Sequence, residues 1–298
     1  MSRKGLILFL IAGTAWGLPY LFIRIAVEDF STWTIVFSRV VVGAAVLIPI
    51  AMKRNVLKPA LKAWPYVLAY AVIEMIFPWF LITEAERVIN SGLAGLLVAT
   101  VPFFGLLIGI FYQKDKSLKH PKTLAGLAIG FTGVVLLVGI DALSGHISVP
   151  HVLMIILASV GYSIAPVIVA TKIPHVSGVA VNGLAMAIVA VVYAVPAAFE
   201  LPKEIAANPP VESWLSIVGL GVICSAVAFV AFFQLIKEIG STRSTLVTYM
   251  NMAVAVVLGI LLLGEPITAG ILIGFPLVLI GSYLATKKHA AKPLTAQI

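Results

Sequence analysis

The chain has 298 residues and a net charge of +8, and 61% of its residues are hydrophobic while 11% are charged. Globular domains average roughly 45–50% apolar and about 25% charged residues, so this chain cannot cover a water-facing surface of ordinary size. The composition predicts an integral membrane protein; it excludes a disulfide-stapled secreted domain, which needs more than one cysteine, and a disordered chain, which needs more charge.

Ten apolar stretches follow one another along the chain. About 20 apolar residues cross a bilayer as a helix, and these stretches are continuously apolar instead of alternating, which favours helices over barrel strands. The first stretch is too long for a signal peptide and lacks a small-residue cleavage site, so we interpret it as a retained span. The predicted fold class is an all-α integral membrane protein with spans at 5–26, 33–52, 64–83, 91–112, 123–140, 150–170, 177–199, 214–236, 245–263 and 270–286.

Basic residues gather on one side of this predicted topology. With the N-terminus in the cytoplasm, the cytoplasmic segments hold sixteen of the twenty Lys and Arg residues, and most acidic residues fall on the opposite side. An excess of Lys and Arg in cytoplasmic loops is the usual orientation signal of membrane proteins. We therefore expect a multi-pass protein of the cell inner membrane with both termini cytoplasmic, and we expect no nucleic-acid partner.

The two halves of the chain resemble each other. The segment that begins at Trp64 aligns with the segment that begins at Trp214 at a shift of 150 residues, and 126–133 aligns with 274–281 at a shift of 148. Each half has five expected spans, an odd number, so the second half enters the membrane upside down. The sequence predicts two inverted five-helix repeats, at 1–145 and 146–289, followed by a cytoplasmic tail at 290–298.

Inverted repeats are typical of secondary transporters, which expose a central site to each side of the membrane in turn. Gly and Pro at corresponding positions mark the expected site, in Trp16-Gly17-Leu18-Pro19 of the first span and in GYSIAP at 161–166 of the sixth. We expect both spans to be kinked or locally unwound there. The alternative is that these prolines are ordinary features of membrane helices.

The order and spacing of these features resemble the drug/metabolite transporter superfamily, specifically its ten-helix EamA-type exporters. The resemblance covers nearly the whole chain in two copies. It rests on Trp16-Gly17, Arg39, the small-residue segment that begins at Ser91, LLLGEP at 261–266 and the glycine-spaced fifth and tenth spans. The chain departs from the pattern at Gln113-Lys114, where the second copy has Gly264-Glu265. The resemblance implies export of amino acids, other metabolites or toxic compounds, and the aromatic amino acid exporters look most similar.

A pore for such substrates needs inward-facing polar groups and aromatic surfaces on which a planar or apolar side chain can stack. Packing or interfacial anchoring is the alternative role for the aromatic residues, and hydrogen bonding between helices is the alternative for the two asparagines. The predicted substrate-binding residues are Trp16, Tyr20, Glu74, Pro78, Trp79, Tyr162, Ser163, Asn182, Tyr249 and Asn251.

Two charged residues lie well inside expected spans, away from the span ends. Glu74 is near the middle of the third span, where an ionised carboxylate costs at least ~2.5 kcal/mol. It could contact the amino group of a substrate or exchange a proton during transport; the alternative is a neutral side chain hydrogen-bonded to a neighbouring helix. Its repeat partner Cys224 cannot carry charge in the same way. For Arg39, in the second span, we favour a structural ion pair.

An enzyme and a channel are the competing hypotheses. The five histidines lie in loops or at span ends, and no phosphate-binding glycine loop occurs, so the sequence predicts no metal, no cofactor and no catalytic residue. A channel would need a ring of like charges. We therefore predict a transporter and not an enzyme, with a drug or other metabolite exporter of the same fold as the alternative. Its expected partners are a small-molecule substrate and the lipid bilayer, in a monomer or a homodimer.

Overall fold

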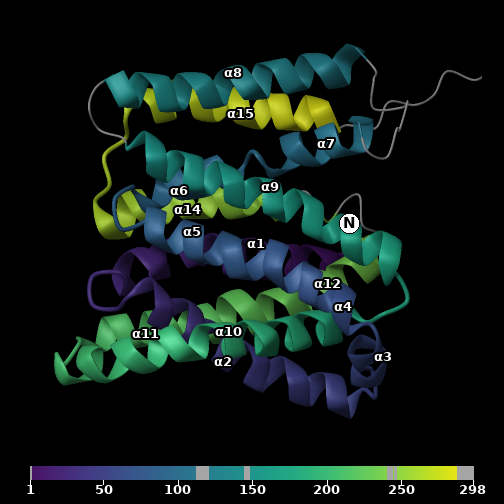
Figure 1. The fold of residues 1–298 in the computed structure, drawn as a ribbon. Helices are drawn as coiled ribbons and strands as arrows, with labels where there is room; N and C mark the ends of the chain where they lie inside the picture. The colour runs from purple at the N-terminus through teal and green to yellow at the C-terminus, as the bar shows by residue number, and fades with distance from the viewer. Residues whose placement is uncertain (1, 112–120, 144–147, 240–243, 245–246, 287–298) are drawn as a thin grey trace, which may run out of the picture.

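The computed structural model describes residues 2–111, 121–143, 148–239, 244 and 247–286, and these residues form helices and no strands (Figure 1). Seven segments are long and apolar enough to cross a membrane. They are α1 (Arg3–Ala26), α2 (Thr32–Lys53), α4–η1–α5 (Trp64–Ala85), α6–α7 (Ser91–Phe111), α9 (Val149–Lys172), α10 (Gly178–Ala206) and α11–η3–α12 (Val211–Ile239).

The remaining expected spans contain helices with shorter apolar stretches. They are α8 (Pro121–Leu143), α14 (Val247–Leu263) and α15 (Ala269–Thr286), whose apolar parts run over Pro121–Leu137, Met250–Leu263 and Ala269–Gly281. A short helix, α3 (Leu57–Lys62), connects α2 to α4. The chain therefore folds as an all-helical integral membrane protein.

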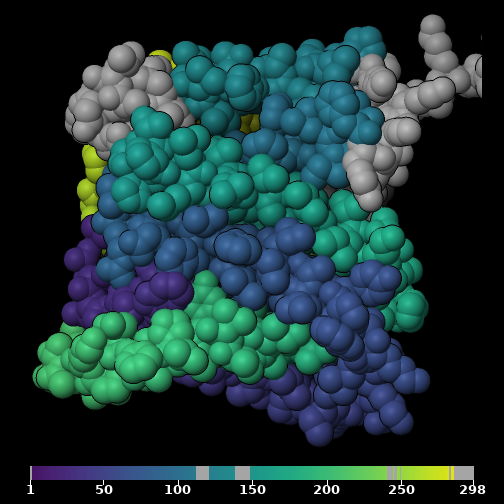
Figure 2. Space-filling model, in the orientation of Figure 1, coloured from purple at the N-terminus to yellow at the C-terminus, as the bar shows by residue number. Residues whose placement is uncertain are grey.

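Helices that are distant in sequence pack along one another (Figure 1). α8 lies beside α15, α2 beside α10, α1 beside α14, and α5 (Phe77–Ala85) beside α9. In every pair one helix comes from the first half of the chain and the other from the second half. Figure 2 shows, in the same orientation, how side chains fill the spaces between these helices on the viewed face. The two halves therefore interlock.

Glycines allow α8 and α15 to pack closely. A Cβ atom at Gly281 would lie 2.7 Å from the carbonyl oxygen of Gly126, and one at Gly133 would lie 2.9 Å from the carbonyl oxygen of Gly274. Side chains at these positions would push the two backbones apart, since real Cβ contacts are longer. These glycines therefore pack helices within one chain.

The helix interruptions lie elsewhere than the sequence indicates. α1 and α9 run without a break through Pro19 and Pro166, so neither helix is locally unwound there, and a kink at these positions stays a prediction. Instead the fourth span is divided at 99–100 into α6 (Ser91–Val98) and α7 (Val101–Phe111), just before Pro102. Proline has no N–H to donate to the preceding turn, which favours a break at this point.

Two further irregularities are π-helical turns. η1 (Val72–Ile76) separates α4 (Trp64–Ala71) from α5, and η3 (Val222–Val227) separates α11 (Val211–Gly221) from α12 (Ala228–Ile239). The two turns begin 150 residues apart, which is the shift that relates the two halves in sequence. A π-turn adds one residue to a helix and leaves backbone groups to be satisfied from outside, and such turns are frequent at functional sites.

The loops at 27–31, 86–90, 207–210 and 264–268 meet at one end of the molecule, which we call the acidic end. The backbone N–H of Ser31 donates to Glu204 at 2.7 Å, and Glu265 accepts from the N–H groups of Ser91 and Gly92 at 2.7 and 2.9 Å. Glu265 thereby caps the N-terminus of α6, where a negative charge is favoured. Loops that the sequence assigns to one side of the membrane thus lie together.

Candidate functional site

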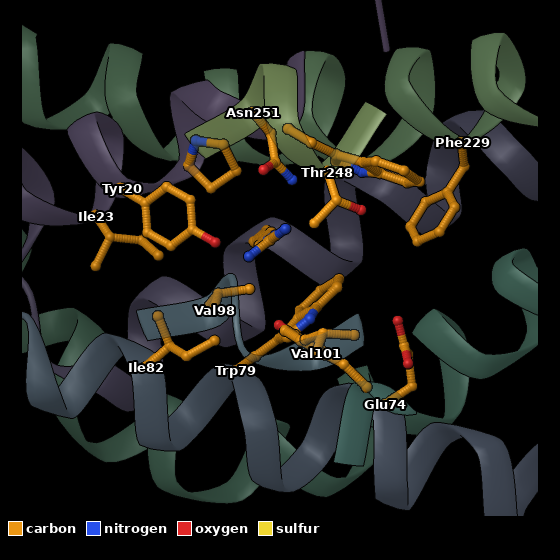
Figure 3. A pocket seen from close by; sticks show the side chains of 14 residues that line it. Tyr20, Ile23, Glu74, Trp79, Ile82, Val98, Val101, Phe229, Thr248 and Asn251 are labelled. Atoms are coloured by element: carbon orange, nitrogen blue, oxygen red, sulfur yellow. The ribbon is translucent and has the colours of Figure 1, made fainter. Parts of the chain in front are cut away.

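A cavity of about 180 Å³ lies at the centre of the helix bundle (Figure 3). Residues from α1, α2, η1, α5, α6 and α7 line it from the first half of the chain, and residues from α9, α12 and α14 line it from the second half. The lining residues are Trp16, Pro19, Tyr20, Ile23, Arg39, Glu74, Trp79, Ile82, Val98, Val101, Tyr162, Phe229, Thr248 and Asn251. Aromatic and aliphatic walls with a few polar groups are typical of small-molecule sites.

α1 reaches the cavity because glycine lets α14 approach it. A Cβ atom at Gly17 would lie 2.5 Å from the Cβ of Val254 and 2.8 Å from the carbonyl oxygen of Asn251. The Trp16-Gly17 sequence therefore combines an aromatic wall with a close helix contact. The indole of Trp16 also packs edge-on against Phe229, with ring centroids 5.5 Å apart.

η1 presents Glu74 to the cavity. Pro78 lacks the N–H that would bond the carbonyl of Glu74 in a regular helix, which favours the wider turn here. The hydroxyl of Tyr193 donates to the carbonyl of Ile76 at 2.7 Å, and a Cβ atom at Gly161 would lie 2.5 Å from the carbonyl oxygen of Ile73. Neighbouring helices therefore hold the turn. In Figure 3 the carboxylate of Glu74 points toward Phe229.

Arg39 lines the same cavity from α2. Its guanidinium carbon lies 3.7 Å from the centre of the Trp79 ring, and its Nε donates to Ser225 Oγ at 3.0 Å. The side chain is 8% exposed and forms no salt bridge with any residue that the structure describes. The expectation of a structural ion pair is therefore wrong for this part of the chain, and a cation–π contact and a hydrogen bond hold the group.

The structure brings six of the predicted residues together in the cavity: Trp16, Tyr20, Glu74, Trp79, Tyr162 and Asn251. Three others are not among the lining residues. Pro78 packs against α9 beside Gly161; the hydroxyl of Ser163 donates to the carbonyls of Ser159 and Val101. Asn182 accepts a hydrogen bond from Tyr70 at 2.9 Å, and hydrogen bonding between helices is the alternative role that the sequence offers for it. The side chain of Tyr249 lies outside the described part of the chain, as does the turn at Gln113-Lys114.

Several lining residues are not among those that the sequence predicts. Arg39 is predicted to have a structural role, although a charge within the membrane is itself a signal for a site. Phe229 and Thr248 line the cavity from the second half, and no local sequence feature distinguishes them from other membrane residues. Val98 and Val101 line the cavity on either side of the break between α6 and α7, and Pro102 was a signal for that break.

A second buried carboxyl lies at the acidic end. Both carboxylate oxygens of Glu86 are buried, and no described residue bonds to them. Arg24 donates to the main-chain carbonyl of Glu86 at 3.4 Å and pairs with the carboxylate of Glu28 at 2.9 Å. Burial raises the pKa of the Glu86 carboxyl well above its usual range, and Glu265 adds to the rise, whereas Arg24 and Arg39 oppose it.

Comparison with known proteins places these features in a family. The model of the EamA-like transporter family matches residues 3–139 and 149–287. The inner membrane transporter YedA of Escherichia coli, named as uncharacterized, is 27% identical over 95% of this chain and 92% of its own length. The uncharacterized transporter YdfC of Bacillus subtilis is 26% identical over 84% of this chain and 80% of its own length.

A solved crystal structure supports the same architecture. It aligns with this chain at a TM-score of 0.63 and 22% identity, over 96% of this chain and 97% of that chain. At this identity the likeness shows the fold alone. None of these relatives carries a substrate in its name.

Proposed function

The chain belongs to the EamA-like transporter family and is a membrane transporter of the drug/metabolite kind, and we propose that it exports amino acids with aromatic or other apolar side chains. Related small metabolites are included in this proposal. Export occurs across the inner membrane by alternating access through the central cavity. The observation that carries the proposal is the lining of that cavity, in which five aromatic rings surround a few polar groups.

Alternating access requires two halves that can move against each other around a fixed site. We propose ten spans in two inverted five-helix repeats, with both termini in the cytoplasm. The family match in two consecutive segments, 3–139 and 149–287, supports the repeat. The π-turns η1 and η3, which begin 150 residues apart, and the pairing of helices across the halves support it as well.

A counterflow assay tests the function. The purified chain is reconstituted in liposomes loaded with one unlabelled amino acid, and entry of the same labelled amino acid is measured across a panel of aromatic, aliphatic, polar and charged side chains. We expect accelerated exchange of aromatic and aliphatic amino acids. Phe229→Ala removes a cavity wall and should slow this exchange, whereas Phe199→Ala, at a 68% exposed position of α10, should not.

The same assay separates the alternatives. Exchange of apolar drugs without exchange of any amino acid would support a drug exporter of the same fold, for which the apolar walls are also suited. Chemical change of a solute, detected by mass spectrometry of the liposome contents, would instead indicate a membrane-embedded enzyme. Labelling of single cysteines placed at Glu204 and Lys58 from the two sides tests the topology, and labelling of both from one side would contradict it.

A further inference from the structure

The central cavity holds one guanidinium and one carboxyl group that do not pair with each other. Arg39 and Glu74 both line it, yet no salt bridge joins them. Opposite charges in an apolar cavity attract strongly, so a separation is held by the surrounding structure. The fold keeps each group in place from a different helix, Arg39 from α2 and Glu74 from η1.

The guanidinium of Arg39 is held with its outer nitrogens available. Its Nε is used by Ser225 and one face of the group lies over Trp79. No described residue accepts a hydrogen bond from its two Nη atoms, and the residue lines the cavity. Arginine stays charged in proteins, and its pair of parallel N–H groups matches the two oxygens of a carboxylate.

The carboxylate of Glu74 is also incompletely satisfied. Its Oε2 is buried and no described residue donates to it, while the residue as a whole lines the cavity. Figure 3 shows the carboxylate pointing into the space below Phe229. An ammonium group on a ligand would supply a donor of opposite charge for this oxygen.

We propose that Arg39 and Glu74 bind the two ends of one zwitterion, with the α-carboxylate on Arg39 and the α-ammonium on Glu74. This inference rests on the proposed function and assigns the orientation of its substrate. A zwitterion neutralises both charges at once, whereas an amine or an acid alone leaves one of them unpaired. The side chain of the substrate then lies against the rings of Trp16, Tyr162 and Phe229.

Three probes of one shape test this assignment. Phenylalanine carries both charges, phenethylamine carries only the ammonium, and 3-phenylpropionate carries only the carboxylate. In liposomes the wild-type chain should exchange phenylalanine roughly tenfold or more faster than either single-charge probe, because each missing contact removes a charged hydrogen bond. Equal exchange of all three probes would overturn the zwitterion site while leaving the transport function intact.

Variants then assign each charge. Arg39→Gln should remove the preference for phenylalanine over phenethylamine, and Glu74→Gln should remove its preference over 3-phenylpropionate. Arg39→Lys keeps the charge without the paired N–H groups and should retain part of the preference. If each glutamine variant lowered exchange of all three probes in the same ratio, the two residues would be structural and the inference would fail.

The probe comparison in the wild-type chain does not depend on whether a variant folds. Phe199→Ala, at an exposed position of α10, serves as the matched control, and its probe ratios should equal those of the wild type. If the wild-type chain exchanged no amino acid but exchanged an uncharged apolar solute, both this inference and the amino acid substrate of the proposed function would fail.

Discussion

The π-turns η1 and η3 share a backbone irregularity and differ in what they bring to the cavity. η1 presents the carboxylate of Glu74 to it, whereas the matching residue of η3, Cys224, is buried among apolar side chains. Through its next residue, Ser225, η3 holds the guanidinium of Arg39. One turn thus supplies a charge directly, and the other supports the opposite charge.

The two turns also have different local causes. Pro78 follows η1 and removes a backbone donor, but the residue at the same shift in the second half is Ala228, so proline does not explain η3. The carbonyl oxygens near the turns are satisfied differently as well. Tyr193 of α10 donates to Ile76 near η1, while Ser225 donates back to Leu220 within its own segment. A wide turn at the same place in both halves therefore does not depend on a single residue type.

The largest expected effect comes from closing the space beside η1. Gly161→Ala places a Cβ atom 2.5 Å from the carbonyl oxygen of Ile73, and a main-chain atom cannot move aside cheaply. We expect a loss of about 1–3 kcal/mol in stability, measured as a lower melting temperature in detergent. Gly105→Ala is the control, since no atom of another described segment lies within 4 Å of its new Cβ, and it should melt like the wild type.

Substituting the central residue of each turn tests whether the two turns differ in their importance for transport. Glu74→Gln removes the charge that faces the cavity and should lower phenylalanine exchange roughly tenfold. Cys224→Ala leaves a small apolar cavity and should cost about 1 kcal/mol of stability with little effect on exchange. Counterflow rates of the two variants check this asymmetry. Equal losses of exchange in both variants would contradict a special role of η1 in transport.

Glu86 provides a test of buried charge away from both turns. Its folded-state pKa is raised, so its favourable contribution to stability is complete below the usual carboxyl pKa and is lost as the pH rises through the raised value. The glutamine of Glu86→Gln cannot ionise. The stability of this variant should therefore match that of the wild type at acidic pH and exceed it as the pH increases. Melting temperatures between about pH 4 and pH 9 measure this difference.

A control separates this effect from general surface charge. Glu200→Gln removes a partly exposed carboxylate that pairs with Lys203 at 3.2 Å. Its melting curve should stay within about 1 kcal/mol of the wild type, because such surface pairs contribute little. A wild-type chain whose stability rose from acidic to neutral pH relative to Glu86→Gln would contradict the assigned pKa direction.

The smallest expected effects concern the hydrogen bonds that satisfy the turns. Tyr193→Phe leaves the carbonyl of Ile76 unpaired and should cost about 1 kcal/mol without changing the probe ratios of the transporter. Ser225→Ala removes the bonds to Leu220 and to Arg39 and should cost a similar amount. Ser225→Ala should also lower the preference for phenylalanine over phenethylamine, whereas Tyr193→Phe should not, because only η3 supports Arg39.

Part of the cavity was predictable because charged and aromatic residues are conspicuous inside apolar spans. Glu74 and Trp79 were identified on this ground, and both line the cavity. Asn182 is also polar within an apolar span, but it bonds to Tyr70, because the rotation of α10 directs it toward α4. Arg39 was misassigned since its neighbours, Ser225 and Trp79, come from other helices and cannot be read from the second span alone.

The sequence by itself determined that the chain is an all-helical membrane protein and where its main helices run. The expected spans 5–26 and 33–52 correspond closely to α1 and α2, because the length of an apolar stretch follows directly from the thickness of the bilayer. The loop charges gave a predicted orientation for the same local reason. These properties depend on consecutive residues and need no knowledge of neighbours.

Only the tertiary structure decided where the helices are interrupted and which groups face one another. Gly17 and Gly161 permit close contacts with neighbouring helices, and their own helices continue unbroken. A helix in lipid satisfies its backbone internally, so an irregular turn persists only where a side chain supplies the missing partner. For η1 that partner is Tyr193 of α10, whereas for η3 it is Ser225 of the same segment. Packing between distant segments also decided that Arg39 and Glu74 line one cavity.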